Sequence, residues 1–565
     1  MALDLPVFMT SGNTVILIHL VILFSVLSVT VMIVRHAISA HTTSSRSKIG
    51  LLVPVLAAIF LGVNMLPINF SGSAVATAGS TRAEQKNVIL IGIDSVSWHH
   101  LESNLGALPN ISRILKDGYM WTDVVTPLAR TFPAWNSVLT GTYPSTHGAL
   151  YNLMPGDRVL KDNLANHFKS KGYTTIYAQD ERRFNNIDES YGFDYVVGPK
   201  VGAADFILPM FSDHPISNVL YRFSLGQRLF PYLALNRVAE YTYHPSLFVD
   251  SISEQLTEAS SPLFLATHLC MTHFPYAWAT SKEMPGGLAA EHEAALRAVD
   301  NQVGGLVGML KKSHVLDNAL LVLFSDHGES IVGGNNEFYS DIEKFVGKKQ
   351  EFHSFVEYKL FSTTTGHGYM LNSKSQYGSF VVFKEFPVSG DLVGRSASRI
   401  SLVSIAPTIL DLLSNEAIGE GVSLLNHMKN GAALSAGPVY SETGLFLSAI
   451  MDPENVDVGE VLNMANRSYE VLENGKVQLT DSAVRTLLNV KEYAVFYQEW
   501  LLMNVQVDHQ NSYVLANMNT GEWTYDWESA LAKSAPVDKL MSLIAQKRNL
   551  TMASVGAESM EKVTN

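Results

Sequence analysis

Leu-Val-Leu-Phe-Ser-Asp-His-Gly-Glu, residues 321–329, is an apolar run that ends in an acid, an imidazole and a glycine. Successive apolar residues predict a strand that is buried on both faces, as in a parallel sheet. Such sheets bind ligands beyond the carboxyl ends of their strands, and Asp326 and His327 are of metal-ligand types. A second run, Asn-Val-Ile-Leu-Ile-Gly-Ile-Asp-Ser at 87–95, also stops at a carboxylate, Asp94. The two strands together predict one site built from both.

The pattern after residue 87 predicts the fold class. Short apolar runs alternate with helical stretches, which indicates an α/β fold with a mostly parallel sheet sandwiched by helices. We expect strands at 87–93, 174–178, 263–269, 319–324 and 380–383, and helices at 160–171, 288–312 and 401–413. Beyond about residue 466, shorter alternating segments predict antiparallel strands and a closing helix. These form a small C-terminal α+β subdomain.

Composition sets limits on function. The chain has 565 residues, of which 47% are apolar, so it can bury a large core. Its net charge is −13 and its Lys and Arg are not clustered, which excludes nucleic acid as an expected partner. A single cysteine, Cys270, cannot form an intrachain disulfide.

The N-terminal region predicts membrane anchoring. Residues 15–34 and 49–70 are two apolar segments, each long enough to cross a bilayer as a helix. The loop between them carries the nearby basic residues, so the positive-inside rule places it in the cytoplasm. We therefore expect two transmembrane helices within 1–70, a linker at 71–86, and an extracytoplasmic or periplasmic domain on the inner cell membrane. Alternatively, the second segment is a signal peptide that is cleaved near Ala74-Val-Ala76.

Five motifs carry a family resemblance. They are NVILIGIDS at 87–95, ARTFPAWNSVLTGTYPSTHG at 129–148, LFLATHLCMTHFPY at 263–276, LVLFSDHGES at 321–330 and TTTGHGYML at 363–371. Their order resembles the alkaline phosphatase superfamily, in its sulfatase-like branch of hydrolases and transferases. The resemblance covers about 87–413. It implies a catalytic domain at 87–445, which the subdomain at 446–565 completes.

The resemblance also implies a site. Asp94, Asp326 and His327 would bind one divalent metal ion, and this mixed oxygen and nitrogen set favours Mn²⁺ or Zn²⁺, with Ca²⁺ or Mg²⁺ as alternatives. Thr131 would be the nucleophile and a further metal ligand. It precedes a helical run, and a helix N-terminus favours a bound anion. His367 would contact the substrate or protonate the leaving group.

Further contacts, and their structural alternatives, come from the same motifs. His273 is a plausible substrate contact, although packing beside Phe274 would explain it nearly as well. Arg130 is a candidate anion contact whose alternative is a surface charge. Asp94 and Thr131 have a helix cap as their alternative. Asp326 and His327 have as their alternative a turn with a hydrogen-bonded His. His367, between two glycines, has a loop position as its alternative.

Departures from the sulfatase pattern select the chemistry. Sulfatases carry Cys or Ser in a CxPSR-type motif and convert it to formylglycine, whereas this chain has Thr131-Phe-Pro-Ala-Trp. The Thr-Phe-Pro run resembles nucleotide pyrophosphatases and phosphodiesterases, and a Thr nucleophile is typical of membrane-anchored phosphoglycerol and phosphoethanolamine transferases. Two-metal relatives place a His four residues after an Asp, where this chain has Asp300 and Gly304. One metal ion is therefore expected.

These observations predict a membrane-anchored, metal-dependent enzyme of phosphate esters. Its partners would be the membrane and a phosphoester-containing lipid or glycan, and it would pass a phospho-headgroup to water, an envelope glycan or a lipid. One alternative is a phosphodiesterase or sulfuric ester hydrolase that acts on small soluble esters. A second alternative, from outside the enzymes, is an inactive envelope binding protein.

Overall fold

The computed structural model describes residues 85–155, 161–199, 202–203, 205, 238, 243–259, 262–274, 276, 287–331, 366–388, 390, 392–434, 437–444, 458–507 and 510–561. The chain divides into two compact units, and all of these residues belong to the larger one, 75–211 with 235–565. Within the described ranges, no helix has both the length and the apolar character needed to cross a membrane. The predicted spans at 15–34 and 49–70 lie outside the described residues.

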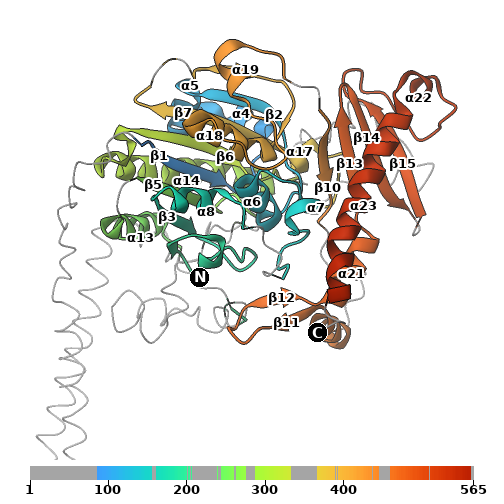
Figure 1. Cartoon of the computed structure of the whole chain (residues 1–565), viewed down its shortest axis with the longest axis horizontal. Coiled ribbons are helices and arrows are strands. Elements are labelled where there is room, and N and C mark those ends of the chain that lie inside the picture. Colours follow the sequence, from blue (N-terminus) through green and yellow to red (C-terminus); the bar gives the residue numbers. More distant parts are fainter. Residues whose placement is uncertain are drawn as a thin grey trace, which may run out of the picture. The chain divides into compact units, whose positions relative to one another are not determined.

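The main sheet places the carboxyl ends of its central strands side by side. Its described strands run in the order β4-β3-β5-β1-β6-β7-β2-β8, with β9 also paired to β2. Figure 1 labels the strands from β3 to β2 in this order. All neighbours are parallel except β7, which is antiparallel to both β6 and β2. The expected mostly parallel sheet is therefore present. The strands are β1 Asn87–Ile93, β2 Tyr119–Val125, β3 Thr174–Gln179, β4 Tyr195–Val197, β5 Leu263–Leu269, β6 Ala319–Ser325, β7 Gly378–Phe386, β8 Gly394–Ser396 and β9 Ile400–Ser401.

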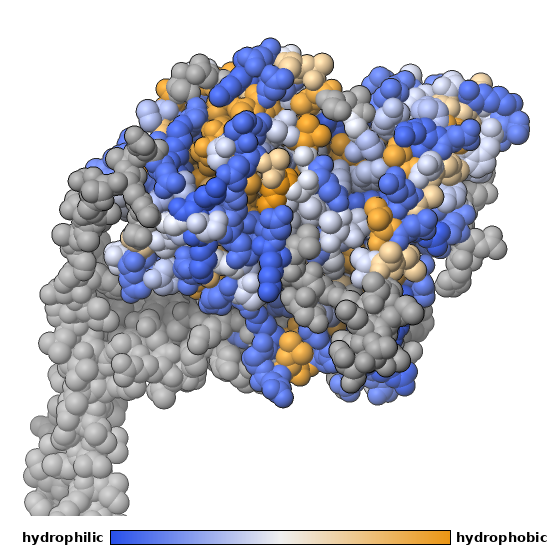
Figure 2. Space-filling model, viewed as in Figure 1, coloured by the Kyte–Doolittle hydropathy of each residue, from blue (hydrophilic) through white to orange (hydrophobic). Residues whose placement is uncertain are grey.

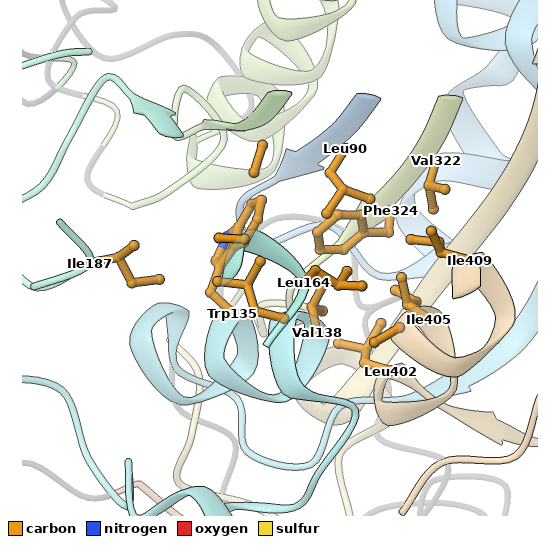
Figure 3. Packing of buried hydrophobic residues seen from close by; sticks show 14 of the residues in the cluster. Leu90, Trp135, Val138, Leu164, Ile187, Val322, Phe324, Leu402, Ile405 and Ile409 are labelled. Carbon is orange, nitrogen blue, oxygen red and sulfur yellow. The ribbon is translucent and has the colours of Figure 1, made fainter. Parts of the chain in front are cut away.

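Helices cover both faces of this sheet because alternate strand residues point to opposite sides. Ile89 and Ile91 of β1 face a cluster built with α4 Trp98–Asn104, α5 Pro109–Lys116, α13 Pro245–Glu258 and α14 Gly287–Lys312. Val88 and Leu90 face α6 Thr131–Thr140, α8 Leu164–Ser170 and α18 Ile405–Ser414. Figure 3 shows this second cluster, in which Trp135 of α6 lies near the strands. The face of the molecule drawn in Figure 2 carries mainly hydrophilic side chains.

Shorter helices connect these layers. They are α7 Pro144–His147, α17 Lys374–Tyr377 and α19 Leu425–Asn430, with 3-10 turns η1 Leu105–Ala107, η3 Glu189–Tyr191, η4 Val315–Asp317 and η5 Leu402–Ser404.

A second, antiparallel sheet lies in the C-terminal part of the chain. Its order is β10-β13-β14-β15-β16, and a separate hairpin pairs β11 with β12. Leu540 and Ile544 of the long helix α23 pack on this sheet. The elements are β10 Val439–Glu442, α20 Val458–Ser468, β11 Tyr469–Val471, β12 Val477–Leu479, α21 Asp481–Asn489, β13 Tyr493–Tyr497, β14 Trp500–Val507, β15 Gln510–Asn517, β16 Trp523–Thr524, α22 Ala530–Ser534 and α23 Val537–Glu561.

Candidate metal centre and active site

Two aspartates meet where the central strands end. β1 and β6 are parallel neighbours with Ile93 opposite Ser325, so Asp94 and Asp326 follow at the same edge of the sheet. Both side chains are buried. The Ser325 hydroxyl contacts the carbonyl oxygens of Ile93, at 2.8 Å, and His327, at 2.7 Å, which ties the two strand ends together. The register of two adjacent strands therefore creates a buried pair of carboxylates.

His327 completes a group of three metal-ligand side chains. Its Nε2 lies 3.4 Å from Asp326 Oδ2 and 3.8 Å from Asp94 Oδ1. Its Nδ1 lies 3.1 Å from the carbonyl oxygen of Gly328, so a proton on Nδ1 would leave Nε2 as an acceptor that faces the acids. Asp326 Oδ1 accepts from the backbone N–H groups of His327, at 2.8 Å, and Ser95, at 3.3 Å. The hydrogen-bonded turn thus orients the predicted ligands.

Gly328 allows this turn to pack closely. A Cβ atom at residue 328 would lie 2.0 Å from the carbonyl oxygen of Ser375, which is far inside van der Waals contact. The N–H of Gly328 donates to the carbonyl of Gln376 at 3.0 Å. The Asp-His-Gly sequence is therefore the pattern that this position of the chain requires.

The donor set fits a divalent metal ion. Asp326 Oδ2 and His327 Nε2 are buried and make no hydrogen bond within the described part of the chain. Donor atoms that each lie about 2.0–2.1 Å from a tetrahedral ion stand about 3.4 Å apart, close to the spacing seen here. Asp94, Asp326 and His327 form a group of the right kind and spacing to hold a metal. Which metal they would bind stays a prediction.

The electrostatics of the two acids also favour a nearby cation. Burial, together with the negative charge of Asp94, raises the pKa of Asp326 to about 8. For Asp94, burial acts against ionisation, but His273 and His268 hold its pKa well below the usual range. Two carboxylates that share a buried site cannot both ionise without a compensating cation. A divalent ion would supply that charge.

His268 is a member of this site that the sequence analysis missed. It lies on β5, and its Nε2 is 3.3 Å from Asp94 Oδ2 and 3.4 Å from Asp326 Oδ2. In the sequence it is enclosed by an apolar strand, Leu-Phe-Leu-Ala-Thr-His-Leu. The signal that would have found it is a polar residue in a buried central strand, because such a group must have a polar partner.

Thr131 is the first residue of α6. Its side chain is buried, and Arg130 rather than Thr131 occupies the N-cap position. One turn further on, the ring of Trp135 contacts the ring of His268, with centroids 5.4 Å apart. Phe132 donates its N–H to Asn152 Oδ1 at 3.3 Å, and Pro133 has no N–H. The positive end of the α6 dipole still favours an anion here. The role of Thr131 as nucleophile and ligand stays a prediction.

Arg130 is buried, so the surface-charge interpretation was wrong. Its Nε donates to the carbonyl of Gly444 at 2.8 Å, and its guanidinium lies over the ring of Tyr369, 4.9 Å from the centroid. Burial lowers its pKa, while Tyr369 and Glu329 act in the opposite direction. A guanidinium remains charged under these conditions. Arg130 thus brings a fixed positive charge to the site.

Three further titratable side chains adjoin the metal-ligand group. The ring of His367 stacks on that of His327, with centroids 4.1 Å apart, and contacts His273 edge-on at 5.1 Å. Its Nδ1 lies 3.4 Å from Glu329 Oε1. Burial and the charge of Arg130 lower the pKa of His367 well below its usual range. For His273, burial acts against protonation, but Asp94 and Glu329 raise its pKa.

The structure also bears on the alternatives. Ser97, not Asp94, is the N-cap of α4, so the cap interpretation of Asp94 was wrong. Asp300 accepts hydrogen bonds from the backbone N–H groups of Asn110, at 3.1 Å, and Ile111, at 2.8 Å, at the start of α5. This carboxylate therefore has a structural role.

The fold and this cluster define a class: an α/β protein with a buried Asp-Asp-His group, suited to a divalent cation, at the carboxyl edge of its sheet. The sulfatase family model matches residues 86–415. The chain therefore belongs to the sulfatase family.

Individual relatives are distant. N-acetylgalactosamine-6-sulfatase of Mus musculus is 21% identical over 404 residues, which cover 67% of this chain and 72% of the mouse protein. Among solved structures, Ps i-CgsB in complex with k-i-k-neocarrahexaose has a TM-score of 0.52 at 17% identity, covering 83% of this chain and 94% of that chain. A phosphonate monoester hydrolase of Agrobacterium radiobacter has a TM-score of 0.49 at 16% identity, covering 82% and 96%. The likeness to Ps i-CgsB indicates a shared fold.

Proposed function

We propose that this chain is a metal-dependent phosphoester transferase or hydrolase that uses Thr131 as its nucleophile. The observation that carries the proposal is a threonine at the start of α6, the helix whose Trp135 contacts His268, where a formylglycine-dependent sulfatase needs Cys or Ser. Threonine has no route to formylglycine, but its hydroxyl can attack phosphorus.

The proposed metal site is formed by Asp94, Asp326 and His327, with the Thr131 hydroxyl as a further ligand. When bound, Mn²⁺ or Zn²⁺ would lower the pKa of that hydroxyl and offset the charge of the phosphoryl oxygens. Asp94 and Asp326 fix the ligand oxygens, and His327 presents Nε2 because its Nδ1 faces a backbone carbonyl.

The remaining residues act on the ester. In the proposed reaction the Thr131 oxygen bonds to phosphorus as the bond to the leaving oxygen breaks, giving a phosphothreonine. Arg130 and the positive end of the α6 dipole stabilise the phosphoryl oxygens. His367 or His273 accepts the proton of the Thr131 hydroxyl and gives a proton to the leaving oxygen. An acceptor hydroxyl or water then displaces the group from Thr131, and its proton returns to the Thr131 oxygen through the same histidine.

The proposed substrate is a membrane phospholipid headgroup, and the proposed acceptor is an envelope glycan or lipid. The support is the pair of apolar segments at 15–34 and 49–70, which would anchor the chain in the inner membrane with the catalytic domain on its outer side. Anchoring would keep the site close to a substrate that is confined to the bilayer.

Mass spectrometry tests the nucleophile. Full-length protein, loaded with Mn²⁺ or Zn²⁺, is exposed to phosphatidylglycerol and phosphatidylethanolamine in mixed micelles, and the peptide that contains Thr131 is analysed. We expect a phospho-headgroup adduct on Thr131 in the wild type. For Thr131→Ala we expect no adduct and an activity loss of about 10³-fold or more, in the range known for catalytic nucleophiles.

Thr486→Ala, on the exposed face of α21, is the matched control and should behave like the wild type. Full activity in Thr131→Ala would exclude Thr131 as nucleophile. Turnover of an aryl sulfate without any adduct would instead favour sulfuric ester hydrolysis, the activity that the name of the mouse relative suggests.

A further inference from the structure

His268 lies between the two carboxylates of the proposed metal site, and the motif at 263–276 that contains it gave it no role. Its Nε2 is 3.3 Å from Asp94 Oδ2 and 3.4 Å from Asp326 Oδ2. The side chain is completely buried in the middle of the sheet. A polar ring in a central strand costs free energy unless its polar atoms are used. Here Nε2 is the ring atom that contacts the two carboxylates.

The surroundings of the ring are shaped to hold it. Gly92 of β1 is the cross-strand neighbour of His268. A Cβ atom on Gly92 would lie 2.9 Å from His268 Nδ1 and 2.6 Å from Trp135 Cζ2, so a larger residue would displace one of the two rings. Trp135 contacts the imidazole edge-on from α6. Thus β1 and α6 fix the imidazole on two sides.

The two ring nitrogens have different surroundings. Within the described residues, Nδ1 has no hydrogen-bond partner, whereas Nε2 donates to Asp94 Oδ2. A buried nitrogen without a partner costs about 1–3 kcal/mol. This cost falls on Nδ1, whereas Nε2 contacts the carboxylates of Asp94 and Asp326. We conclude that the contact with the two carboxylates is the main role of the imidazole.

The carboxylate oxygens are divided between His268 and the other groups. Asp94 directs Oδ2 at His268, and its Oδ1 faces His327 Nε2 at 3.8 Å and accepts from the Ser95 hydroxyl at 2.8 Å. Asp326 places Oδ1 against two backbone N–H groups, so its Oδ2 is the oxygen that faces both histidines. His268 therefore fixes the side-chain rotation of Asp94. It also lies next to Oδ2 of Asp326, the oxygen proposed to bind the metal.

We infer that His268 is a positioning residue for the metal site: it holds the Asp94 and Asp326 carboxylates in the orientation that binds the cation, without being a required ligand. Partners of this kind orient the ligands of metal sites, and their loss typically lowers metal affinity about 10–100-fold. The inference rests on the proposed metal-dependent function.

Metal titration of the full-length, metal-stripped protein tests the inference. Binding of Mn²⁺ and of Zn²⁺ is measured by calorimetry for the wild type, His268→Ala and His268→Gln. We expect about 10–100-fold weaker binding for His268→Ala, with an unchanged number of bound ions. His268→Gln should lose less, because a glutamine amide can place an N–H donor near the position of Nε2.

His147→Gln is the matched control, because His147 is also buried but lies in α7, outside the cluster. It should lower thermal stability without changing metal affinity. If His268→Ala fails to fold, His268→Gln carries the test, and the melting temperature of each metal-free variant shows whether it is folded. A purely structural role of His268 would lower that temperature and leave the affinity of folded protein unchanged.

The outcomes separate two failures. If the wild type binds neither ion, the proposed metal-dependent function is wrong. If the wild type binds metal and both His268 variants bind it equally well, only the positioning role is wrong. Complete loss of binding in both variants would make His268 a required ligand and would also overturn the positioning role.

Discussion

Metal binding and stability place opposite requirements on the Asp326 side chain. Its Oδ1 is held by two backbone N–H groups, and its Oδ2 is directed at two histidines. Burial and the negative charge of Asp94 raise the pKa of Asp326 to about 8, so its charged form, which would bind a cation, is disfavoured. Residues placed for a bound ion are strained when the ion is absent, so stability and function compete at this position.

Asp326→Asn should reveal this competition. Metal-free Asp326→Asn is expected to be more stable than the metal-free wild type, by on the order of 1–3 kcal/mol, because the amide removes the repulsion between the acids. Excess Mn²⁺ or Zn²⁺ should raise the melting temperature of the wild type, because ligand binding stabilises the folded state. Excess metal should have little effect on Asp326→Asn.

Thermal unfolding with and without chelator measures the metal-free stability and the metal-dependent rise in melting temperature. An equal metal-dependent rise in the wild type and in Asp326→Asn would mean that Asp326 is not a ligand.

At the scale of elements, close packing between β1 and α6 positions the site. Gly92 lies between His268 on β5 and Phe324 on β6 in the strand register. The Trp135 ring covers this position and contacts both neighbours, with centroids 5.4 Å from His268 and 5.2 Å from Phe324. The helix that begins with Thr131 and the strand that ends before Asp94 therefore meet at one glycine.

Gly92→Ala should disturb both stability and metal binding. The added methyl group would lie 2.6 Å from Trp135 Cζ2, and overpacking of this kind costs about 1–3 kcal/mol. Because the His268 ring must also move, we expect weaker binding of Mn²⁺ and Zn²⁺.

Gly106→Ala is the control for this substitution, since nothing lies within 4 Å of its Cβ position. Urea unfolding and metal titration compare the two variants. Equal behaviour of Gly92→Ala and Gly106→Ala would show that the β1–α6 contact does not support the site.

Elements with simple patterns were predictable from the sequence. The strand expected at 87–93 is β1 at the same bounds, and the helix expected at 288–312 is α14, Gly287–Lys312. Long apolar or amphipathic runs make such elements plain. By contrast, β2 was missed because Thr122 and Asp123 interrupt its apolar residues, and its register shifts between Trp121 and Val124.

Some residues of the candidate site were predictable from the sequence, and others were not. Asp94, Asp326 and His327 come at strand ends, where a polar residue after an apolar run is visible in the sequence. His268 lies inside a strand, and its meeting with two acids depends on how β5, β1 and β6 are aligned. The spacing of residues along the sequence does not reveal how these strands are aligned. The part of the site that follows from sheet register therefore required the structure.

At the scale of the whole molecule, the C-terminal sheet contacts the strand and loop that lead to the site. The N–H of Glu442, at the end of β10, donates to the carbonyl of Pro127 at 2.9 Å, and the N–H of Gly444 donates to that of Gly368 at 2.9 Å. Lys491, completely buried, pairs with Glu442 at 3.4 Å and donates to the carbonyl of Thr443 at 2.6 Å. The family match ends at residue 415, yet residues beyond it support Arg130 and the segment of His367.

The junction of α7 and α23 links the stability of the molecule to pH. His147 is buried in α7; its Nδ1 accepts from the N–H of Ala149 at 3.1 Å, so its Nε2 carries the proton and donates to the Ser137 hydroxyl at 2.9 Å. Burial, and the charge of Lys547 on α23, lower the pKa of His147 to about 3. A proton on Nδ1 would oppose an N–H donor, so the folded state keeps this ring neutral.

Acid should therefore destabilise the fold through His147. As the pH falls below about 6.5, the unfolded chain gains a proton on this histidine that the folded chain does not bind, so the free energy of unfolding falls. The loss continues until the pH approaches about 3, and at about 1.4 kcal/mol per pH unit it amounts to about 5 kcal/mol. In His147→Gln this titration is absent, so the variant should lose less stability on acidification. At neutral pH it should be less stable than the wild type, because the glutamine side chain does not reproduce both hydrogen bonds of the buried ring. Urea unfolding between about pH 7 and pH 5 measures both slopes, with His99→Gln, at an exposed position of α4, as the control. Equal slopes for the wild type and His147→Gln would mean that His147 is not the group that senses acid, since a neutral buried imidazole has to contribute to the difference.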